Sequence, residues 1–333
     1  MRARIWSRRD WLRLASVAGV TGVAEVVGDT RILPRRSTQT ALADGGLVSY
    51  CSLADVKPGS SPESEYRIGI WTRCWDPAPW EQALDEAVAA GYTNVGLMTH
   101  DHWKPVMTFD MPFEKAEELR NAGVQRGLRF PAAYCPGFGL DPTTFDVGVV
   151  GLRRMIDLCV TAGVSMILLG GTSEATLQDI YYQTVLECCD YAQERGITMT
   201  VKPHGGLNAT SAQCAAIVRL VGHPAFRLCY DPGNVFFYSD GTLDPKSDVK
   251  DAMGLVSAVC IKDFLPPKNV DVTPGDGKVD FTAVFQALRE GGFLSGDLIV
   301  ETVLATESME ERRREAIRAR QFVGKLIASL SPM

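Results

Sequence analysis

The sequence lacks the motifs that identify several common classes of protein. It has no Cys-x-x-Cys pair, which excludes the usual zinc sites of that type, and no Gly-x-Gly-x-x-Gly after its first apolar run, which disfavours a doubly wound dinucleotide-binding sheet. The weakly apolar stretch 14–28 is interrupted by Glu25 and is too short to span a bilayer comfortably. We therefore expect no stable membrane span.

Acidic residues outnumber basic ones outside the N-terminus. The chain of 333 residues has a net charge of -6 at pH 7, but residues 1–43 hold eight Arg against three acids, so that segment carries +5 and the remainder -11. A nucleic-acid ligand requires a basic surface. The sequence thus predicts no nucleic-acid partner.

An export signal is predicted at the N-terminus. Residues 7–13 resemble the twin-arginine motif, with Trp11 for the usual Phe, and Ala41-Leu42-Ala43 is a plausible cleavage site. The alternative is a disordered basic tail. We expect residues 1–43 to be a twin-arginine signal peptide and residues 44–64, which are rich in Gly, Ser and Pro, to be a linker. The mature protein would then be periplasmic or otherwise extracytoplasmic.

Replacing Arg8 and Arg9 together with Lys tests this assignment. The double variant should leave the precursor in the cytoplasm, because the twin-arginine pair is the feature that the export route reads. Cell fractionation of the wild type and the variant measures the effect. Unchanged export of the variant would rule the route out.

The cysteines are compatible with such a route. There are nine, an odd number without paired spacing, and several, such as Cys159 and Cys229, lie inside expected helices or strands. A free cysteine there behaves as a small buried hydrophobe. Because the twin-arginine route carries folded proteins, these thiols are buried before they meet an oxidising compartment.

Eight apolar runs alternate with segments of helical periodicity. One such segment has apolar residues three and four apart from Val149 to Cys159 and ends at Gly163, and Ser308 with Glu311 is spaced as a capping box for the last helix. Eight strand–helix pairs in about 265 residues are typical of a (β/α)8 TIM barrel, an α/β fold that we predict for residues 65–332. The expected strands are 67–71, 94–98, 128–134, 164–169, 198–204, 227–231, 256–263 and 298–301.

Ionisable side chains collect at the ends of the last four expected strands. They are Lys202, His204, Asp231, Lys262, Asp263 and Glu301. Each alone would pass as a solvated strand end or a turn former. Residues two apart in a strand face the same way, however, so Lys202 and His204 point into the barrel mouth together, as do Cys260 and Lys262. Since barrel enzymes keep their chemistry at this face, the convergence predicts an active site.

At these residues the chain resembles the xylose-isomerase-like TIM barrels, the superfamily of sugar and sugar-phosphate isomerases and epimerases. The resemblance spans roughly residues 66–330. It rests on Lys202-Pro-His204-Gly-Gly, Asp231-Pro-Gly-Asn234, Cys260-Ile-Lys262-Asp263, Pro274-Gly-Asp-Gly-Lys-Val-Asp280-Phe and Ile299-Val-Glu301. It implies one divalent cation bound by a Glu, an Asp, a His and a Glu. Endonuclease IV shares the fold, but its His-rich multi-zinc site is incompatible with only four His.

Two of the four implied ligands are replaced in this chain. Lys202 stands where the family has its first Glu, and Cys260 stands where it has its His, so that Asp231 and Glu301 alone persist. Lys202 with these two carboxylates has the same net charge, -1, as three carboxylates with a dication. We expect the Lys202 ammonium to replace the cation, leaving no cofactor. The alternative is one Mn, Zn or Mg ion held by His204, Asp231 and Glu301.

The resemblance also implies roles for the site residues. Glu301 would be the base that moves a proton through an enediolate, held by Lys202 or by a metal, while Asp231 would orient that cation and bind substrate. His204 would bind a hydroxyl or act as a second acid. Lys262, paired with Asp263, would polarise a substrate oxygen, and Asp263 would also bind substrate. A Schiff base on Lys202 is disfavoured by its flanking acids.

Two residues near the ends of the first strands complete the predicted site. His100 and Trp71 could contact a substrate, although a surface loop and a barrel plug are the respective alternatives. We predict an isomerase or epimerase acting on a keto-sugar or polyol-derived hydroxyketone, with a small carbohydrate as its partner. A lyase or dehydratase acting on an oxidised sugar and a sugar-binding barrel without catalysis are the alternatives. A homo-oligomer is compatible with the sequence.

Overall fold

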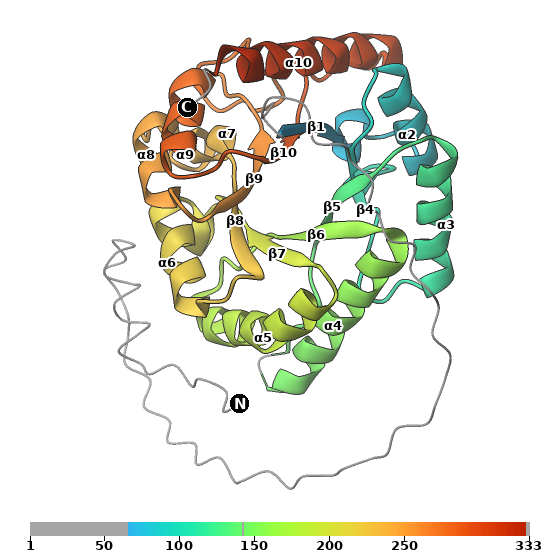
Figure 1. Cartoon of the computed structure of the whole chain (residues 1–333), viewed down its shortest axis with the longest axis vertical. Helices are drawn as coiled ribbons and strands as arrows, with labels where there is room; N and C mark the ends of the chain where they lie inside the picture. The colour runs from blue at the N-terminus through green and yellow to red at the C-terminus, as the bar shows by residue number, and fades with distance from the viewer. Residues whose placement is uncertain (1–65, 142, 331–333) are drawn as a thin grey trace, which may run out of the picture.

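A computed structural model describes residues 66–141 and 143–330, so the predicted signal peptide and linker lie outside the described residues. Figure 1 shows strands at the centre of a ring of helices, with the C-terminal helix α10 (Met309–Ser329) running along one side of the ring. The predicted catalytic domain is the part of the chain that the structure describes.

Eight strands form one sheet in the order β2-β1-β10-β9-β8-β7-β6-β5. Parallel bridges join Asn94 to Arg129 and Leu97 to Ala133, so the two edges of the sheet meet and the barrel closes. All neighbours are parallel, which brings the C-terminal ends of the strands to one face and confirms the predicted (β/α)8 fold. The strands are β1 (Tyr66–Trp71), β2 (Val95–Gly96), β5 (Phe130–Cys135), β6 (Val164–Leu169), β7 (Thr198–Val201), β8 (Phe226–Tyr230), β9 (Val256–Ile261) and β10 (Gly296–Val300).

The helices cover the outside of the barrel. They are α2 (Trp80–Ala89), α3 (Phe113–Gln125), α4 (Phe145–Ala162), α5 (Ala175–Glu194), α6 (Ser211–Val221), α7 (Pro232–Tyr238), α8 (Pro245–Ala252), α9 (Phe281–Glu290) and α10, with short 3-10 turns η1 (Thr72–Trp75) and η2 (Gly206–Asn208). Helix α4 ends as predicted at Gly163, whose φ of 77° is left-handed. Only half of the predicted capping box forms at α10: Ser308 Oγ accepts the Glu311 N–H, but the Glu311 carboxylate bonds Thr306.

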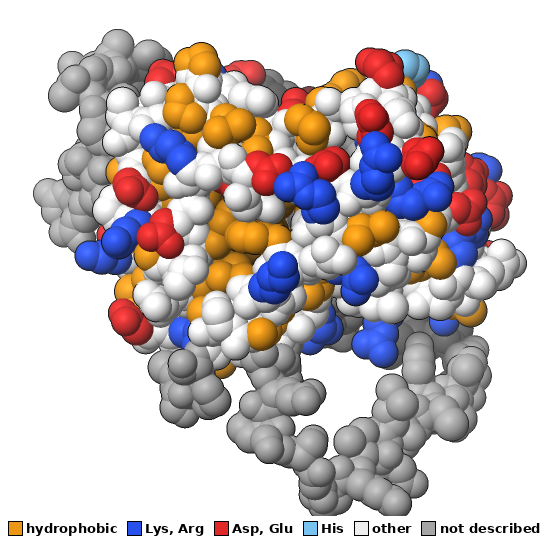
Figure 2. All heavy atoms as spheres, turned by 90° about the horizontal axis from the view of Figure 1, so that it is seen from above, with side chains coloured by type: hydrophobic (Ala, Val, Ile, Leu, Met, Phe, Trp, Pro, Cys, Tyr) orange, Lys and Arg blue, Asp and Glu red, His pale blue; other side chains and the backbone are white. Residues whose placement is uncertain are grey.

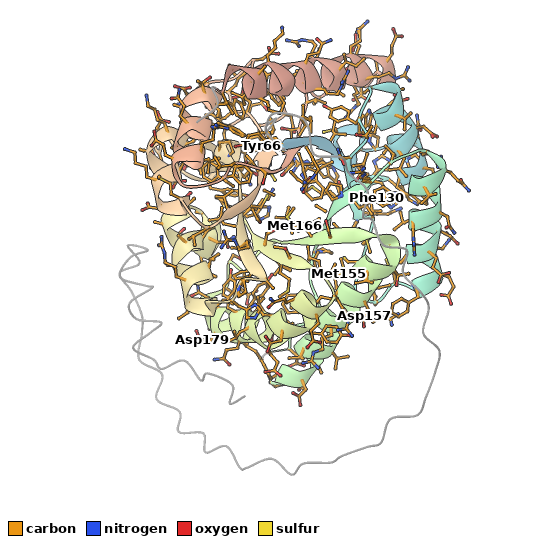
Figure 3. The ribbon with its side chains drawn as sticks, in the orientation of Figure 1. Tyr66, Phe130, Met155, Asp157, Met166 and Asp179 are labelled. Carbon is orange, nitrogen blue, oxygen red and sulfur yellow. The ribbon has the colours of Figure 1, made fainter. Side chains whose placement is uncertain are left out.

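The core has an inner and an outer part. Trp71, Met98, Met166 and Cys260 belong to the cluster inside the barrel, and a larger cluster lies between the strands and the helices. Figure 3 labels one methionine of each part, Met166 on β6 toward the centre and Met155 on α4 outside the strands. The eight described cysteines are buried and free of disulfides, as predicted; the ninth lies outside the described residues.

The outer face of α10 is a solvated surface. Figure 2, which views the molecule from this side, shows acidic and basic side chains interspersed. Arg313 pairs with Glu86 of α2, and Arg318 pairs with Asp276.

Two short strands that the sequence did not predict, β3 (Thr99–His100) and β4 (Lys104–Pro105), pair after β2. Within the described part of the chain, no helix is long and apolar enough to cross a membrane.

Candidate active site

Four of the predicted residues meet at the C-terminal ends of neighbouring strands. Lys202, Asp231, Lys262 and Glu301 directly follow β7, β8, β9 and β10, and each is at most 2% exposed. Because parallel strands end at one face of the barrel, residues 99 positions apart in sequence come into contact there. The predicted convergence of these four residues is thus observed.

Glu301 lies at the centre of this cluster. Its Oε2 accepts a hydrogen bond from Lys202 Nζ at 2.6 Å, and its Oε1 accepts one from Lys262 Nζ at 2.5 Å and one from Arg73 Nη1 at 3.3 Å. Asp231 Oδ2 accepts from Lys202 Nζ at 3.1 Å and lies 3.6 Å from Lys262 Nζ. The two lysines therefore bridge the two carboxylates. Such short charge-assisted bonds fix the geometry of buried groups.

The cluster keeps Glu301 and Lys202 ionised. Burial alone would raise the pKa of Glu301, but the positive charges of Lys202, Lys262 and Arg73 outweigh it and hold that pKa well below its ordinary value. Burial would likewise lower the pKa of Lys202, yet the negative charge of Glu301 leads the groups that raise it well above its ordinary value. A neutral Lys202 amine, which a Schiff base requires, is therefore disfavoured.

Sequence reasoning missed two members of the site. Arg73 lies in η1, immediately after β1, and the strand-end rule applied to the second half of the barrel would have found it in the first half. Asn234 is the last residue of the Asp231-Pro-Gly-Asn motif. Its Oδ1 accepts from Lys262 Nζ at 3.1 Å, and its N–H donates to Asp231 Oδ1 at 2.9 Å. The motif thus orients both a lysine and a carboxylate.

His204 lies at the rim of the mouth. Its ring is accessible to solvent and stands 5.7 Å from the ring of Tyr238, centroid to centroid. Although accessible, it sits deep among protein atoms, so desolvation, followed by the charge of Lys202, lowers its pKa to about 4. The imidazole is therefore neutral at neutral pH.

The donor atoms at the mouth do not fit a divalent cation. Among the described residues, the potential ligand atoms that lie within 4.8 Å of one another belong to Asp231, Cys260 and Glu301, and His204 is outside this group. Both carboxylates already bond the Lys202 ammonium. Burial, followed by the neighbouring Cys229, raises the pKa of the Cys260 thiol, whereas a metal requires a thiolate.

The Asp263 carboxylate organises a loop and does not pair with Lys262. Its two oxygens accept N–H groups from Phe264, Gly275, Gly277 and Val279 at 2.8 to 3.0 Å. The predicted Lys262–Asp263 pair is wrong, because consecutive residues at a strand end point to opposite sides. Substrate binding by Asp263 is unsupported, since four N–H donors already occupy its carboxylate.

Trp71 and His100 carry buried polar atoms without a partner. Trp71 is fully buried inside the barrel, and its Nε1 has no hydrogen-bond partner among the described residues. The same holds for Nδ1 of the half-buried His100. A buried donor without an acceptor costs about 1–3 kcal/mol. Substrate contact therefore stays the prediction for both residues.

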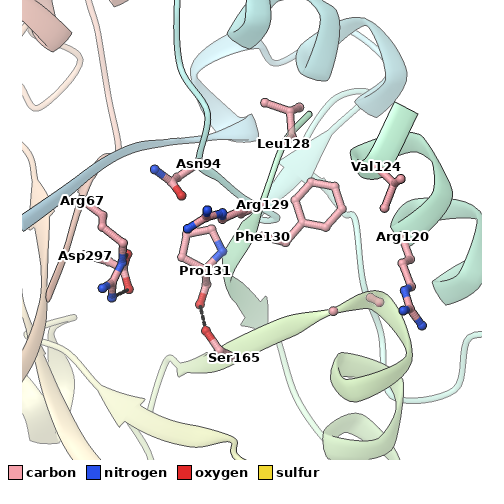
Figure 4. Close-up of a pocket in the computed structure, with 12 residues that line it drawn as sticks. Arg67, Asn94, Arg120, Val124, Leu128, Arg129, Phe130, Pro131, Ser165 and Asp297 are labelled. Atoms are coloured by element: carbon pink, nitrogen blue, oxygen red, sulfur yellow. Dashed lines mark hydrogen bonds and ion pairs between the residues drawn. The ribbon is translucent and has the colours of Figure 1, made fainter. Parts of the chain in front are cut away.

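A cavity of about 420 Å³ lies away from this cluster, at the N-terminal ends of β1, β5, β6 and β10 (Figure 4). Arg67, Arg120 and Arg129 are among its lining residues. Its lining carboxylate, Asp297, accepts two hydrogen bonds from Arg67 at 2.9 and 3.0 Å. Among the described residues that line the cavity, Asp297 is the only carboxylate and no His, Cys or Lys accompanies it, so the cavity is not the candidate for proton transfer, despite its size.

Comparisons with known proteins agree with this barrel. The sequence profile described as "Xylose isomerase-like TIM barrel" matches residues 84–323. L-ribulose-5-phosphate 3-epimerase UlaE of Shigella boydii serotype 18 is 24% identical over 264 residues, which cover 73% of this chain and 88% of that protein.

Solved structures show the same fold. A xylose isomerase-like TIM barrel protein from Mycobacterium smegmatis in complex with magnesium superposes with a TM-score of 0.64 at 16% identity, over 79% of this chain and 97% of that one. D-psicose 3-epimerase of Clostridium cellulolyticum H10 with D-tagatose gives a TM-score of 0.63 at 12% identity, over 78% and 99%.

Proposed function

We propose a sugar isomerase or epimerase activity for this chain, which belongs to the xylose isomerase-like TIM barrel family. The observation that carries the proposal is the buried contact of Glu301 with the ammonium groups of Lys202 and Lys262 at the catalytic face of the barrel. The names of UlaE and of D-psicose 3-epimerase supply the reaction type, an epimerisation beside a keto group. The substrate would be a keto-sugar or a related hydroxyketone.

The two lysines would stabilise the negative charge that forms in the reaction. Removing a proton beside a carbonyl places this charge on the carbonyl oxygen and gives an enediolate. Lys202 and Lys262 present fixed ammonium groups in a site from which water is excluded. Asp231 would hold both lysines in place, and Asn234 would orient Lys262. No metal enters this scheme, because the donors already serve the lysines.

Glu301 would be the proton-transferring base. Its low pKa makes it a weak base while three cations bond it. As charge develops on the substrate oxygen, Lys202 and Lys262 shift their hydrogen bonds toward that oxygen, and the basicity of Glu301 rises at the moment when it takes the proton. The lysines would thus couple stabilisation of the oxyanion to activation of the base.

Neighbouring groups would hold the rest of the sugar. The neutral His204 imidazole can donate to one hydroxyl or accept from it. Trp71 Nε1 offers a buried donor to a second oxygen. His100 Nδ1 lies in the segment after the second strand and would meet a substrate from that side.

Solvent exchange tests the proposed activity. The purified protein is incubated in deuterated water with a panel of keto-hexoses and keto-pentoses, and proton NMR follows both deuterium at the carbon beside the keto group and the products. Deuterium incorporation together with an epimer or aldose is the expected result. Loss of water from the sugar would instead identify a dehydratase, and tight binding without any exchange would identify a sugar-binding barrel.

A further inference from the structure

We propose that the substrate carries a carboxylate, and that Arg73 binds it. The substrate class is then a keto-sugar acid rather than a neutral keto-sugar. This inference rests on the proposed function, since it concerns the same barrel mouth. It depends, however, on the charge and geometry of Arg73 and not on the identity of the base.

The bonded groups at the mouth carry an excess of positive charge. Arg73, Lys202 and Lys262 contribute three positive charges, and Asp231 and Glu301 contribute two negative ones. In this structure the half-exposed Asp271, whose Oδ1 lies 3.8 Å from Arg73 Nη2, supplies the compensating negative charge. A neutral sugar that displaced Asp271 from Arg73 would leave one positive charge unbalanced, whereas a sugar that bears one carboxylate would balance it.

Arg73 is placed to receive that carboxylate. Its side chain is 21% exposed, so it reaches from the buried Glu301 to the open mouth. Its Nη1 donates to Glu301 at 3.3 Å, and its Nη2 lies 3.8 Å from Asp271 Oδ1, beyond hydrogen-bond distance. Asp271 is half exposed, and such a pair contributes little. A substrate carboxylate would replace Asp271 as the partner of Nη2.

A loop that packs against the Arg73 side chain, residues 101–103, has a backbone conformation that is rare for its residues. Asp101, His102 and Trp103 have φ angles of 43°, 61° and 67°, three successive left-handed residues without a glycine. Such residues cost of the order of 1–2 kcal/mol each and persist where surrounding contacts hold them. Here both carboxylate oxygens of Asp76 accept the Trp103 N–H at 3.1 Å.

This turn places an aromatic ring against the guanidinium. The ring centroid of Trp103 lies 4.9 Å from Arg73 Cζ, and the side chain is 60% exposed. The contact restricts Arg73 to one direction, and the exposed indole forms a rim against which a sugar ring can pack. An arginine fixed in this way between a buried base and an open rim is suited to a charged substituent on a substrate.

The charge count favours a carboxylate over a phosphate. A carboxylate carries one negative charge and, in place of Asp271, keeps the cluster neutral. A phosphate monoester carries about -1.5 to -2 at neutral pH and would leave the cluster negative beside Glu301. The guanidinium of Arg73 also matches the planar carboxylate with its second, unbonded edge.

Matched ligands that differ at one carbon test the proposal. Isothermal titration calorimetry compares D-fructuronate and D-tagaturonate with D-fructose and D-tagatose, and with the 6-phosphates of those two sugars. We expect the wild type to bind at least one uronate about 10- to 100-fold more tightly than the neutral sugar, the range for one charge-assisted hydrogen bond. Arg73→Met should remove that preference and change the affinity for the neutral sugar only slightly.

Two further variants control the comparison. Arg126→Met removes the same charge from a surface pair with Asp85 at the opposite end of the barrel, and it should leave every affinity unchanged. Asp271→Asn removes the competing carboxylate, and it should tighten uronate binding several-fold, a result that does not depend on the stability of the Arg73 variant.

Each outcome decides the proposal. Equal binding of uronates and neutral sugars, preference for the phosphates, absence of binding to the whole panel, or weaker uronate binding by Asp271→Asn would overturn it. Tight uronate binding without exchange of the carbon-bound proton would uphold the carboxylate site and overturn the proposed isomerase activity. Exchange with neutral sugars alone would uphold the proposed isomerase activity and overturn the carboxylate site.

Discussion

The Glu301→Gln variant should stop the exchange of a substrate's carbon-bound proton with solvent, with a loss of turnover of about 10²- to 10⁴-fold, the range for removal of a general base. The amide keeps the shape of the side chain and can still accept one hydrogen bond, but it cannot take a proton. Proton NMR in deuterated water measures the exchange. Glu290→Gln, at an exposed position in α9, is the matched control and should exchange at the wild-type rate.

The same substitution should weaken the fold. Glu301 accepts hydrogen bonds from Lys202, Lys262 and Arg73, and the amide leaves these cations with Asp231 as their buried counter-charge. Breaking a buried ion pair in this way costs about 3–5 kcal/mol. Urea denaturation should show a loss of that order for Glu301→Gln, so assays are done at a temperature at which circular dichroism shows the variant folded.

A variant at Lys202, alone and combined with Glu301→Gln, shows whether Glu301 and Lys202 act in one step. Lys202→Met should lower turnover by about 10²- to 10³-fold, as for loss of one oxyanion donor. The double variant should be scarcely slower than the slower single variant, because groups that act in the same step are not additive. Wild-type exchange by folded Glu301→Gln, or fully additive losses, would contradict the assignment of the base.

Restoring the family's ligands should create a metal site. In Lys202→Glu combined with Cys260→His, a carboxylate replaces the bridging ammonium and an imidazole replaces the thiol beside Asp231 and Glu301. The four donors then match those that the resemblance implies, and a divalent cation can enter. A bound ion at about 100 times its dissociation constant adds about 2.7 kcal/mol to the free energy of unfolding.

Titration of this double variant with Mn²⁺ or Zn²⁺ during thermal unfolding measures the effect. The melting temperature should rise with metal concentration in the double variant and stay constant in Lys202→Met with Cys260→His, which lacks the new carboxylate. A double variant that binds neither ion would show that these positions do not correspond to the family's ligands.

The sequence predicted the strands and most of the site for a simple physical reason. Buried parallel strands are continuous apolar runs, and their ends share one face, so Lys202, Asp231, Lys262 and Glu301 could be placed together without coordinates. The rule holds as long as the chain continues in the direction of the strand. Lys202 directly follows β7, whereas His204 lies two residues further along, where the chain has left the direction of the strand, and its side chain lies at the rim.

The parts of the site that the sequence did not predict depend on the paths of loops. Asp263 faces away from Lys262, as the alternation of a strand requires, but its carboxylate accepts N–H groups from residues 264–279, a loop whose path no periodicity in the sequence encodes. Arg73 joins the site from a short 3-10 turn after β1, a position that the strand-end rule reaches only when it is applied to the first half of the barrel as well. The left-handed turn that places Trp103 beside it ends in a tryptophan, a bulky residue that seldom adopts this conformation, and three such residues in succession without a glycine could not be expected from composition.

The central claim is that the Lys202 ammonium stabilises the enediolate in place of a divalent cation. The metal content of the wild-type protein tests this claim most directly. Purified full-length chain is equilibrated with Mn²⁺, Mg²⁺ and Zn²⁺, freed of unbound ions and analysed by elemental mass spectrometry, and its proton-exchange activity is measured with and without a chelator. We predict no stoichiometric ion and unchanged activity in the chelator, because Lys202 occupies both carboxylates. A stoichiometric ion whose removal abolishes exchange would contradict the account.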